Sequence, residues 1–144
     1  MQWIAIVWSG FVATTIATAF FWLCRSLGWT QFSPPVQLGC LVIPDPRRPV
    51  TETVGFAILF TLGSTVVPAL YGAILGAWTG PAWVGGLILG GFWGLAVAAA
   101  LPLYGTISAC VRSGAISLPG PFGIGWGRPT PGIIFAGHMI YGAI

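Results

Sequence analysis

Long apolar runs separated by polar, proline-rich connections are the main feature of this chain. Crossing the hydrocarbon core of a bilayer, about 30 Å thick, takes roughly 20 apolar residues in a helix. Three runs reach this length, at residues 3–24, 53–78 and 82–104. They lack the alternation of apolar and polar positions that a membrane β-barrel requires, and backbone groups in lipid must be satisfied internally. The pattern therefore predicts membrane-spanning helices.

A fourth apolar run, at residues 132–144, is shorter than the others. As a helix it extends for about 20 Å, which is too short to cross a bilayer. Either this helix continues beyond Ile144, which we favour, or it is a half-helix sheltered by protein.

The connections between these runs differ in length. Residues 79–81 allow only a tight turn between two antiparallel helices, whereas residues 25–52 and 105–131 form long loops rich in proline and glycine. Within the first loop, a serine followed by two prolines predicts a short helix near residues 34–42, lying at the membrane interface. The predicted fold is a single all-α membrane domain, with four transmembrane helices (the fourth short or truncated) and an interfacial half-helix.

The composition also indicates a membrane environment, because 56% of the residues are hydrophobic and only 5% are charged. Soluble domains carry about 25% charged residues. The basic side chains are five arginines, too few for the phosphate-tracking surface of a nucleic-acid-binding protein. All of them fall in the two long loops, which the positive-inside rule places in the cytoplasm. We therefore expect a multi-pass protein of the bacterial inner membrane, with both termini outside.

The candidate reactive residues are sparse. Cys24, Cys40 and Cys110 are odd in number and show no metal-binding spacing, so we interpret them as free thiols and expect no metal site. Asp45 and Glu52 lie at the membrane edge, with no histidine or cysteine spaced beside them for nucleophilic catalysis. We expect that this chain is not an enzyme.

Glycines recur every four residues on two of the predicted helices, as small residues do where helices in lipid pack closely. These glycines are Gly72, Gly76, Gly80, Gly86, Gly90 and Gly94. Their faces are interpreted as helix-packing surfaces, either within the chain or toward another subunit.

Charged residues gather in two proline-rich turns. Asp45, which can pair with Arg47 or Arg48, lies in "IPDPRRPVTE", and Arg128 lies in "GRPTP". These residues are candidates for contact with lipid headgroups or with a partner's loop. The alternative is a solvated turn whose arginines only orient the chain.

His138 is the one histidine of the chain, inside the last apolar run. Ionisable groups at membrane depth are often functional, and a neutral imidazole can bind haem iron or the magnesium of a chlorophyll-type pigment. Gly137 and Gly142 would leave room for a planar ring. The competing interpretation is that His138 hydrogen-bonds a backbone carbonyl or a neighbouring tyrosine.

The segments "LGCLVIPDPRRP", "LYGAILGAW" and "GRPTPGIIFAGHMIYGAI" resemble a family of small bacterial four-helix integral membrane proteins. The resemblance implies the four-helix fold and a last helix that extends past Ile144, but no known activity. Three functions follow from the sequence. The first is a non-catalytic accessory subunit of a larger respiratory or photosynthetic membrane complex, contacting other membrane subunits and lipids. The second is a small oligomeric transporter or channel, and the third a pigment- or haem-binding module using His138.

Overall fold

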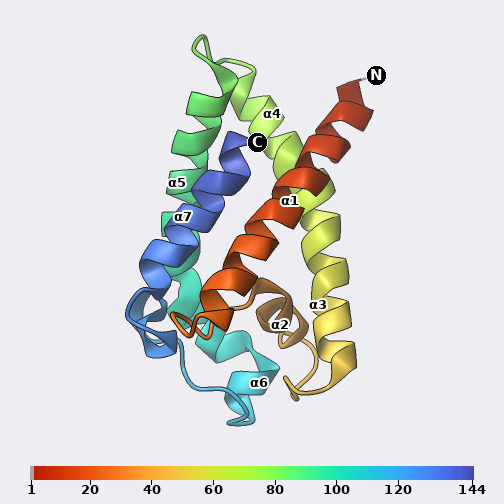
Figure 1. Cartoon of the computed structure of the whole chain (residues 1–144). Helices are drawn as coiled ribbons and strands as arrows, with labels where there is room; N and C mark the ends of the chain where they lie inside the picture. Colours follow the sequence, from red (N-terminus) through yellow and green to blue (C-terminus); the bar gives the residue numbers. More distant parts are fainter. Residues whose placement is uncertain (1) are drawn as a thin grey trace.

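A computed structural model describes residues 2–144, which form helices joined by turns with no strand among them (Figure 1). The expected all-α fold is confirmed for this part of the chain. The long helices are α1 (Gln2–Ser26), α5 (Ala82–Ile107), α7 (Thr130–Ala143) and a helix in three parts: α3 (Pro49–Thr61), the π-helical turn η1 (Leu62–Val66) and α4 (Val67–Leu75). Helix α3 begins earlier than its apolar run because a proline at the first helical position favours initiation.

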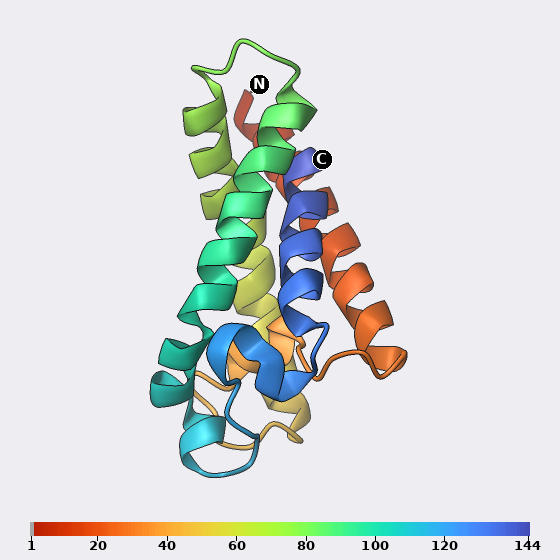
Figure 2. The same cartoon turned by 90° about the vertical axis from the view of Figure 1, so that its left-hand side faces the viewer.

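Three of these helices are long and apolar enough to cross a membrane: Trp3–Ser26, Pro49–Leu75 and Ala82–Ile107. Helix α7 has 14 residues and is about 21 Å long at 1.5 Å per residue. It lies beside α5 in both views (Figures 1 and 2), so protein covers much of its length. The described residues thus contain three candidate spans, and a fourth stays a prediction.

The short elements gather at one end of the bundle, where Figure 2 also shows the long loops. They are α2 (Pro34–Gly39), α6 (Ala109–Arg112) and the irregular turn η2 (Pro121–Trp126). Helix α2 begins with two prolines after Ser33, as expected, but it ends at Gly39, before residue 42. Its position at a membrane interface stays a prediction. Helix α2 packs directly on α3, where Gly55 meets the carbonyl of Pro35 and Gly39 meets that of Thr51. A side chain at either glycine would overlap this backbone, so both are needed for the close approach.

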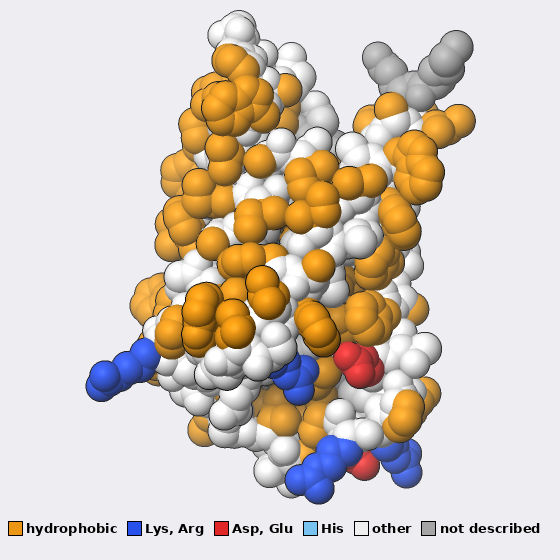
Figure 3. All heavy atoms as spheres, in the orientation of Figure 1, with side chains coloured by type: hydrophobic (Ala, Val, Ile, Leu, Met, Phe, Trp, Pro, Cys, Tyr) orange, Lys and Arg blue, Asp and Glu red, His pale blue; other side chains and the backbone are white. Residues whose placement is uncertain are grey.

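The main hydrophobic core forms where α1, α5 and α7 meet the loops near this end. Its buried members are Ala17, Phe21, Cys24, Phe32, Ala98, Leu101, Trp126, Ile133 and Ile134. Elsewhere the helices present apolar side chains outward, as Figure 3 shows along the length of the bundle. An outer surface of this kind suits lipid and would be unfavourable in water.

The charged side chains lie at the loop end, with apolar surface between them and the opposite end (Figure 3). The start of α1, the end of α7 and the turn between α4 and α5 lie together at that opposite end (Figures 1 and 2). The arginines therefore share one side of the bundle, and the ends of the described chain share the other.

Cys40 and Cys110 form a disulfide between the two long loops, with their Cα atoms 5.3 Å apart. Both cysteines are fully buried. The interpretation of three free thiols was therefore wrong for this pair, and it holds only for the buried Cys24. The physical reason is tertiary: the Ala109 N–H donates to the Cys40 carbonyl at 2.8 Å, which brings α6 against the end of α2.

Candidate functional site

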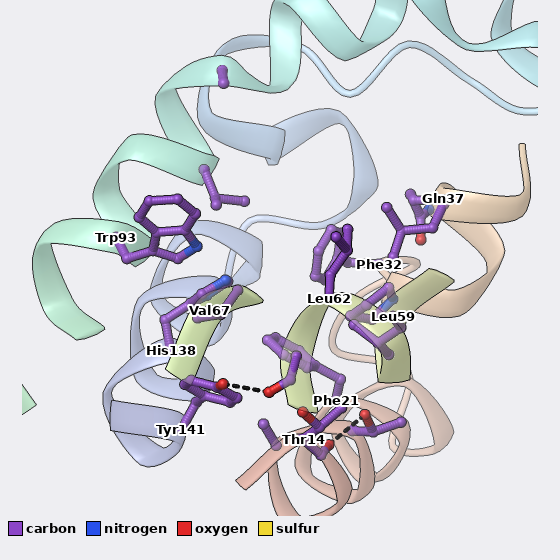
Figure 4. Close-up of a pocket in the computed structure, with 18 of the residues that line it drawn as sticks. Thr14, Phe21, Phe32, Gln37, Leu59, Leu62, Val67, Trp93, His138 and Tyr141 are labelled. Atoms are coloured by element: carbon purple, nitrogen blue, oxygen red, sulfur yellow. Dashed lines mark hydrogen bonds between the residues drawn. The ribbon is translucent and has the colours of Figure 1, made fainter. Parts of the chain in front are cut away.

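A partly open cavity of about 380 Å³ lies between α1, the α3–α4 helix, α5 and α7, with α2 at one end (Figure 4). Its lining includes the exposed residues Leu62, Trp93 and Ala100, so it opens to the outside of the bundle. Its volume falls within the range of about 300–1,000 Å³ seen for small-molecule sites. Most of its walls are apolar or aromatic. Polar groups enter from Thr14, Thr18, Gln37, Tyr104, His138 and Tyr141.

Several of these polar groups are already bonded within the protein. The Thr14 hydroxyl donates to the Gly10 carbonyl at 2.7 Å, and the Thr18 hydroxyl donates to the Thr14 carbonyl at 2.6 Å. Such bonds to the preceding helical turn are a common way for threonine to be satisfied in a membrane helix. These two hydroxyls are therefore poor candidates for holding a ligand.

Tyr141 is bonded to the opposite wall, because its hydroxyl donates to the Gly63 carbonyl at 2.6 Å (Figure 4). That carbonyl has lost its helical partners. The Val67 N–H bonds one residue further back, to Leu62, in the π-helical turn, and Pro68 has no N–H. The Tyr141 hydroxyl thus supplies the hydrogen bond that the Gly63 carbonyl lacks within its own helix, and this bond joins α7 to η1.

His138 has one ring nitrogen engaged and one facing the cavity. Nδ1 lies 2.7 Å from the Ile134 carbonyl of the same helix. A carbonyl only accepts, so Nδ1 carries the hydrogen and Nε2 carries the lone pair. The structure shows no hydrogen bond between Nε2 and residues 2–144. The expected bond to a backbone carbonyl is present, and it leaves a free acceptor pointing into the cavity.

Gln37, across the cavity from His138 in Figure 4, was missed by sequence reasoning. Its Oε1 accepts the Ser33 N–H at 2.7 Å, and the Tyr104 hydroxyl donates to its backbone carbonyl at 3.1 Å. The side-chain NH₂ has no bond to any of residues 2–144. Nothing in the local sequence distinguishes Gln37 from a surface glutamine, because its burial depends on where α2 docks.

The space that we expected for a planar ring at Gly137 and Gly142 is filled by protein, so that prediction was wrong. The Phe21 ring packs against Gly137, so that a Cβ there would lie 2.8 Å from Phe21 Cε1. Gly142 is in backbone contact with Gly86 of α5. Neither glycine leaves a slot beside His138.

The two glycine series have different surroundings. Gly86, Gly90 and Gly94 face α7, meeting Gly142, the carbonyl of His138 and the backbone of Phe135. Around Gly72 there is open space within 4 Å, Gly76 meets only carbonyls of its own helix, and Gly80 meets the Trp78 ring. The α5 series is therefore a packing surface inside the chain. In the other series only Gly72 lies within α4, and it has no partner helix among residues 2–144, whereas Gly76 caps α4 and Gly80 lies in the turn that follows.

The charged residues singled out in the sequence lie at the loop end, away from the cavity lining (Figure 3). Asp45 Oδ2 lies 3.7 Å from Arg48 Nε, and this pair is exposed. The Arg47 N–H donates to Asp45 Oδ1 at 3.0 Å, and the buried Thr51 hydroxyl donates to the Asp45 carbonyl at 2.6 Å. This turn is thus ordered by its own bonds. The Arg47 and Arg128 side chains are exposed.

No group of three or more histidine, cysteine, aspartate or glutamate side chains in the described residues is placed to hold a metal ion. No protein-family model, curated protein or solved structure matches this chain. The resemblance to a family of small bacterial membrane proteins accordingly stays a prediction.

Proposed function

We propose that this chain is a non-catalytic membrane module that holds a lipophilic small molecule in the cavity at His138. The observation that carries the proposal is the cavity itself, with apolar and aromatic walls and a free ring nitrogen at His138. A cavity retains water only where several polar groups converge on it. Here most polar groups are bonded elsewhere, so a membrane-soluble occupant fits better than water.

The non-catalytic part of the proposal follows from the composition of the cavity. Neither Asp45 nor Glu52 lines it, and His138 has no carboxylate or thiol partner among the lining residues, whose Thr14, Thr18 and Tyr141 hydroxyls already donate to backbone carbonyls. General acid–base chemistry needs such a partner within hydrogen-bond reach. Binding, without chemistry, is the role these residues support.

The test is to purify the protein in mild detergent, extract it with organic solvent and identify co-extracted molecules by mass spectrometry. Ala100→Phe places a ring at a cavity-lining position and should reduce the retained molecule severalfold. Ala99→Phe is the matched control, because the neighbouring residue does not line the cavity. Equal retention by both variants and the parent protein would contradict the proposal.

A second function, as an accessory subunit of a larger membrane complex, is supported by the open surface of α4 at Gly72. Gly72 has nothing within 4 Å, although small residues spaced in this way usually let another helix approach closely. A helix of another membrane subunit would fit there. The two roles are compatible, because the open face and the cavity involve different residues. The transporter or channel alternative gains no support from a cavity with apolar walls.

We propose that the protein lies in the bacterial inner membrane, with an orientation opposite to the one expected from its arginines. The arginines favour a cytoplasmic loop end, whereas a disulfide at that end needs an oxidising compartment. The arginine bias is a tendency that acts during insertion. A disulfide in a reducing compartment is removed by continuing thiol exchange. We therefore propose that the loop end lies outside and that the start of α1 and the end of α7 face the cytoplasm.

A further inference from the structure

We infer that the molecule bound in the cavity presents a hydroxyl group to His138, and that it is a lipophilic phenol or alcohol. This inference rests on the proposed binding function and names the chemistry of its ligand. It depends on which partner each polar group of the cavity already has.

The state of the His138 ring determines what it can bind. With the Nδ1 hydrogen donated to the Ile134 carbonyl at 2.7 Å, Nε2 is a pure acceptor. A ligand carbonyl or ether oxygen next to Nε2 would be repelled, because both atoms carry lone pairs and neither carries a hydrogen. A hydroxyl supplies the missing hydrogen, so the site discriminates by the direction of one hydrogen bond.

The other carbonyl acceptors near His138 already accept one hydrogen bond each. The Gly63 carbonyl is occupied by Tyr141, and the Gly10 and Thr14 carbonyls receive threonine hydroxyls. Across the cavity, the free NH₂ of Gln37 offers a donor to an oxygen at the far end of a longer ligand. The two free groups are therefore complementary, with an acceptor at His138 and a donor at Gln37.

The walls near His138 suit an aromatic or alicyclic headgroup. Phe21 lies edge-on to the His138 ring, with centroids 6.1 Å apart, and edge-on to Phe32 at 5.3 Å. Edge-to-face contacts of this kind favour a ring among them. A tetrapyrrole metal could also accept the Nε2 lone pair, but Phe21 and Gly86 fill the spaces at Gly137 and Gly142 that such a plane would need. The packing around His138 therefore favours a ligand with a hydroxyl group over a tetrapyrrole.

The experiment uses the single histidine of the chain as a reporter. Protein labelled with the heavy isotope of nitrogen in histidine gives the resonances of one imidazole, whose chemical shifts distinguish the two tautomers. It is titrated in detergent micelles with para-octylphenol and with its methyl ether, para-octylanisole, which keeps the shape but lacks the donor. The expected spectrum of the free protein shows a protonated Nδ1 and an unprotonated Nε2. The phenol should move the Nε2 resonance upfield and bind about fivefold or more tightly than the ether.

The variant arm removes the acceptor. His138→Phe keeps an aromatic ring and should bind both probes equally, with an affinity close to that of the parent protein for the ether. If the parent protein binds both probes equally and Nε2 does not move, the hydroxyl inference is wrong and the apolar binding function stands. If neither probe binds, the binding function is wrong as well. A protonated Nε2 in the free protein also overturns the inference, and that measurement does not depend on the folding of any variant.

Discussion

The hydroxyl of Tyr141 donates a hydrogen bond of 2.6 Å to the backbone carbonyl of Gly63, 78 residues earlier in the chain. This bond joins the short last helix to the irregular turn of the second span. It exists because Pro68 has no N–H and the Val67 N–H bonds to Leu62. In lipid no water is present to take that place, so one side chain completes the backbone bonding of another helix.

Tyr141→Phe should therefore destabilise the fold, by about 1–2 kcal/mol, because it leaves the Gly63 carbonyl unpaired. Tyr71→Phe is the matched control. Its ring lies 5.7 Å from that of Tyr141, and its buried hydroxyl has no partner. We expect that change to be neutral or slightly stabilising. Unfolding in mixed micelles at increasing denaturing detergent measures both, and equal losses would contradict the assigned role of the bond.

The cost of Tyr141→Phe should also depend on Pro68. Pro68→Ala restores an N–H to the helix, and the turn can then return toward α-helical bonding without help from Tyr141. We expect a coupling of about 1 kcal/mol between the two substitutions in a double-mutant cycle. Additive effects would show that the π-helical turn does not depend on the proline.

The two glycine series should respond differently to a methyl group. At Gly90 a Cβ would collide with the backbone of His138 on α7, whereas at Gly72 it would meet nothing within 4 Å. We expect Gly90→Ala to destabilise the protein by roughly 1–3 kcal/mol, as overpacking does. Gly72→Ala should be neutral or gain up to about 1 kcal/mol from helix propensity.

A larger side chain at Gly72 tests the accessory-subunit role. If α4 docks on another membrane subunit, Gly72→Leu should weaken the co-purification of that subunit while the isolated chain keeps its stability. A Gly72→Leu protein that retains every partner of the parent protein would count against docking through this face.

The disulfide should be detectable as a faster-migrating band in non-reducing electrophoresis, lost in Cys40→Ala or Cys110→Ala and kept in Cys24→Ala. The bridge joins residues 70 positions apart, a loop for which chain-entropy arguments give up to about 4 kcal/mol of stabilisation. Reduction should therefore lower the midpoint of unfolding of the parent protein and leave that of Cys40→Ala unchanged.

The proposed orientation is tested on intact cells with a membrane-impermeant thiol reagent. A single cysteine placed at exposed Arg47, in a background with Cys24, Cys40 and Cys110 all replaced by alanine, should be labelled from outside if the loop end is extracytoplasmic. A cysteine replacing exposed Thr79, in the turn between α4 and α5, should be protected. The reverse pattern would restore the orientation indicated by the arginines.

Much of the candidate site could not be predicted from the sequence. The bond of His138 to a backbone carbonyl is a local property of a helix, four residues apart, and one of the two sequence interpretations included it. Gln37 became part of the site only through the docking of α2. The Cys40–Cys110 pair did have a signal, because both cysteines lie in loops predicted to share one end of the bundle. The odd number of cysteines instead favours free thiols.

The sequence by itself determined the apolar helices and the placement of charge along the chain, and it predicts a membrane environment. Apolar runs long enough to cross a bilayer must bond their backbones internally, and arginines confined to two loops must share one end. Tertiary structure alone decided which glycine face meets another helix, where the cysteines pair and which polar groups are left free in the cavity. The physical reason is that hydropathy and helix formation depend on neighbours along the chain. Packing contacts, such as that of Tyr141 with Gly63, depend on partners that only the folded bundle brings together.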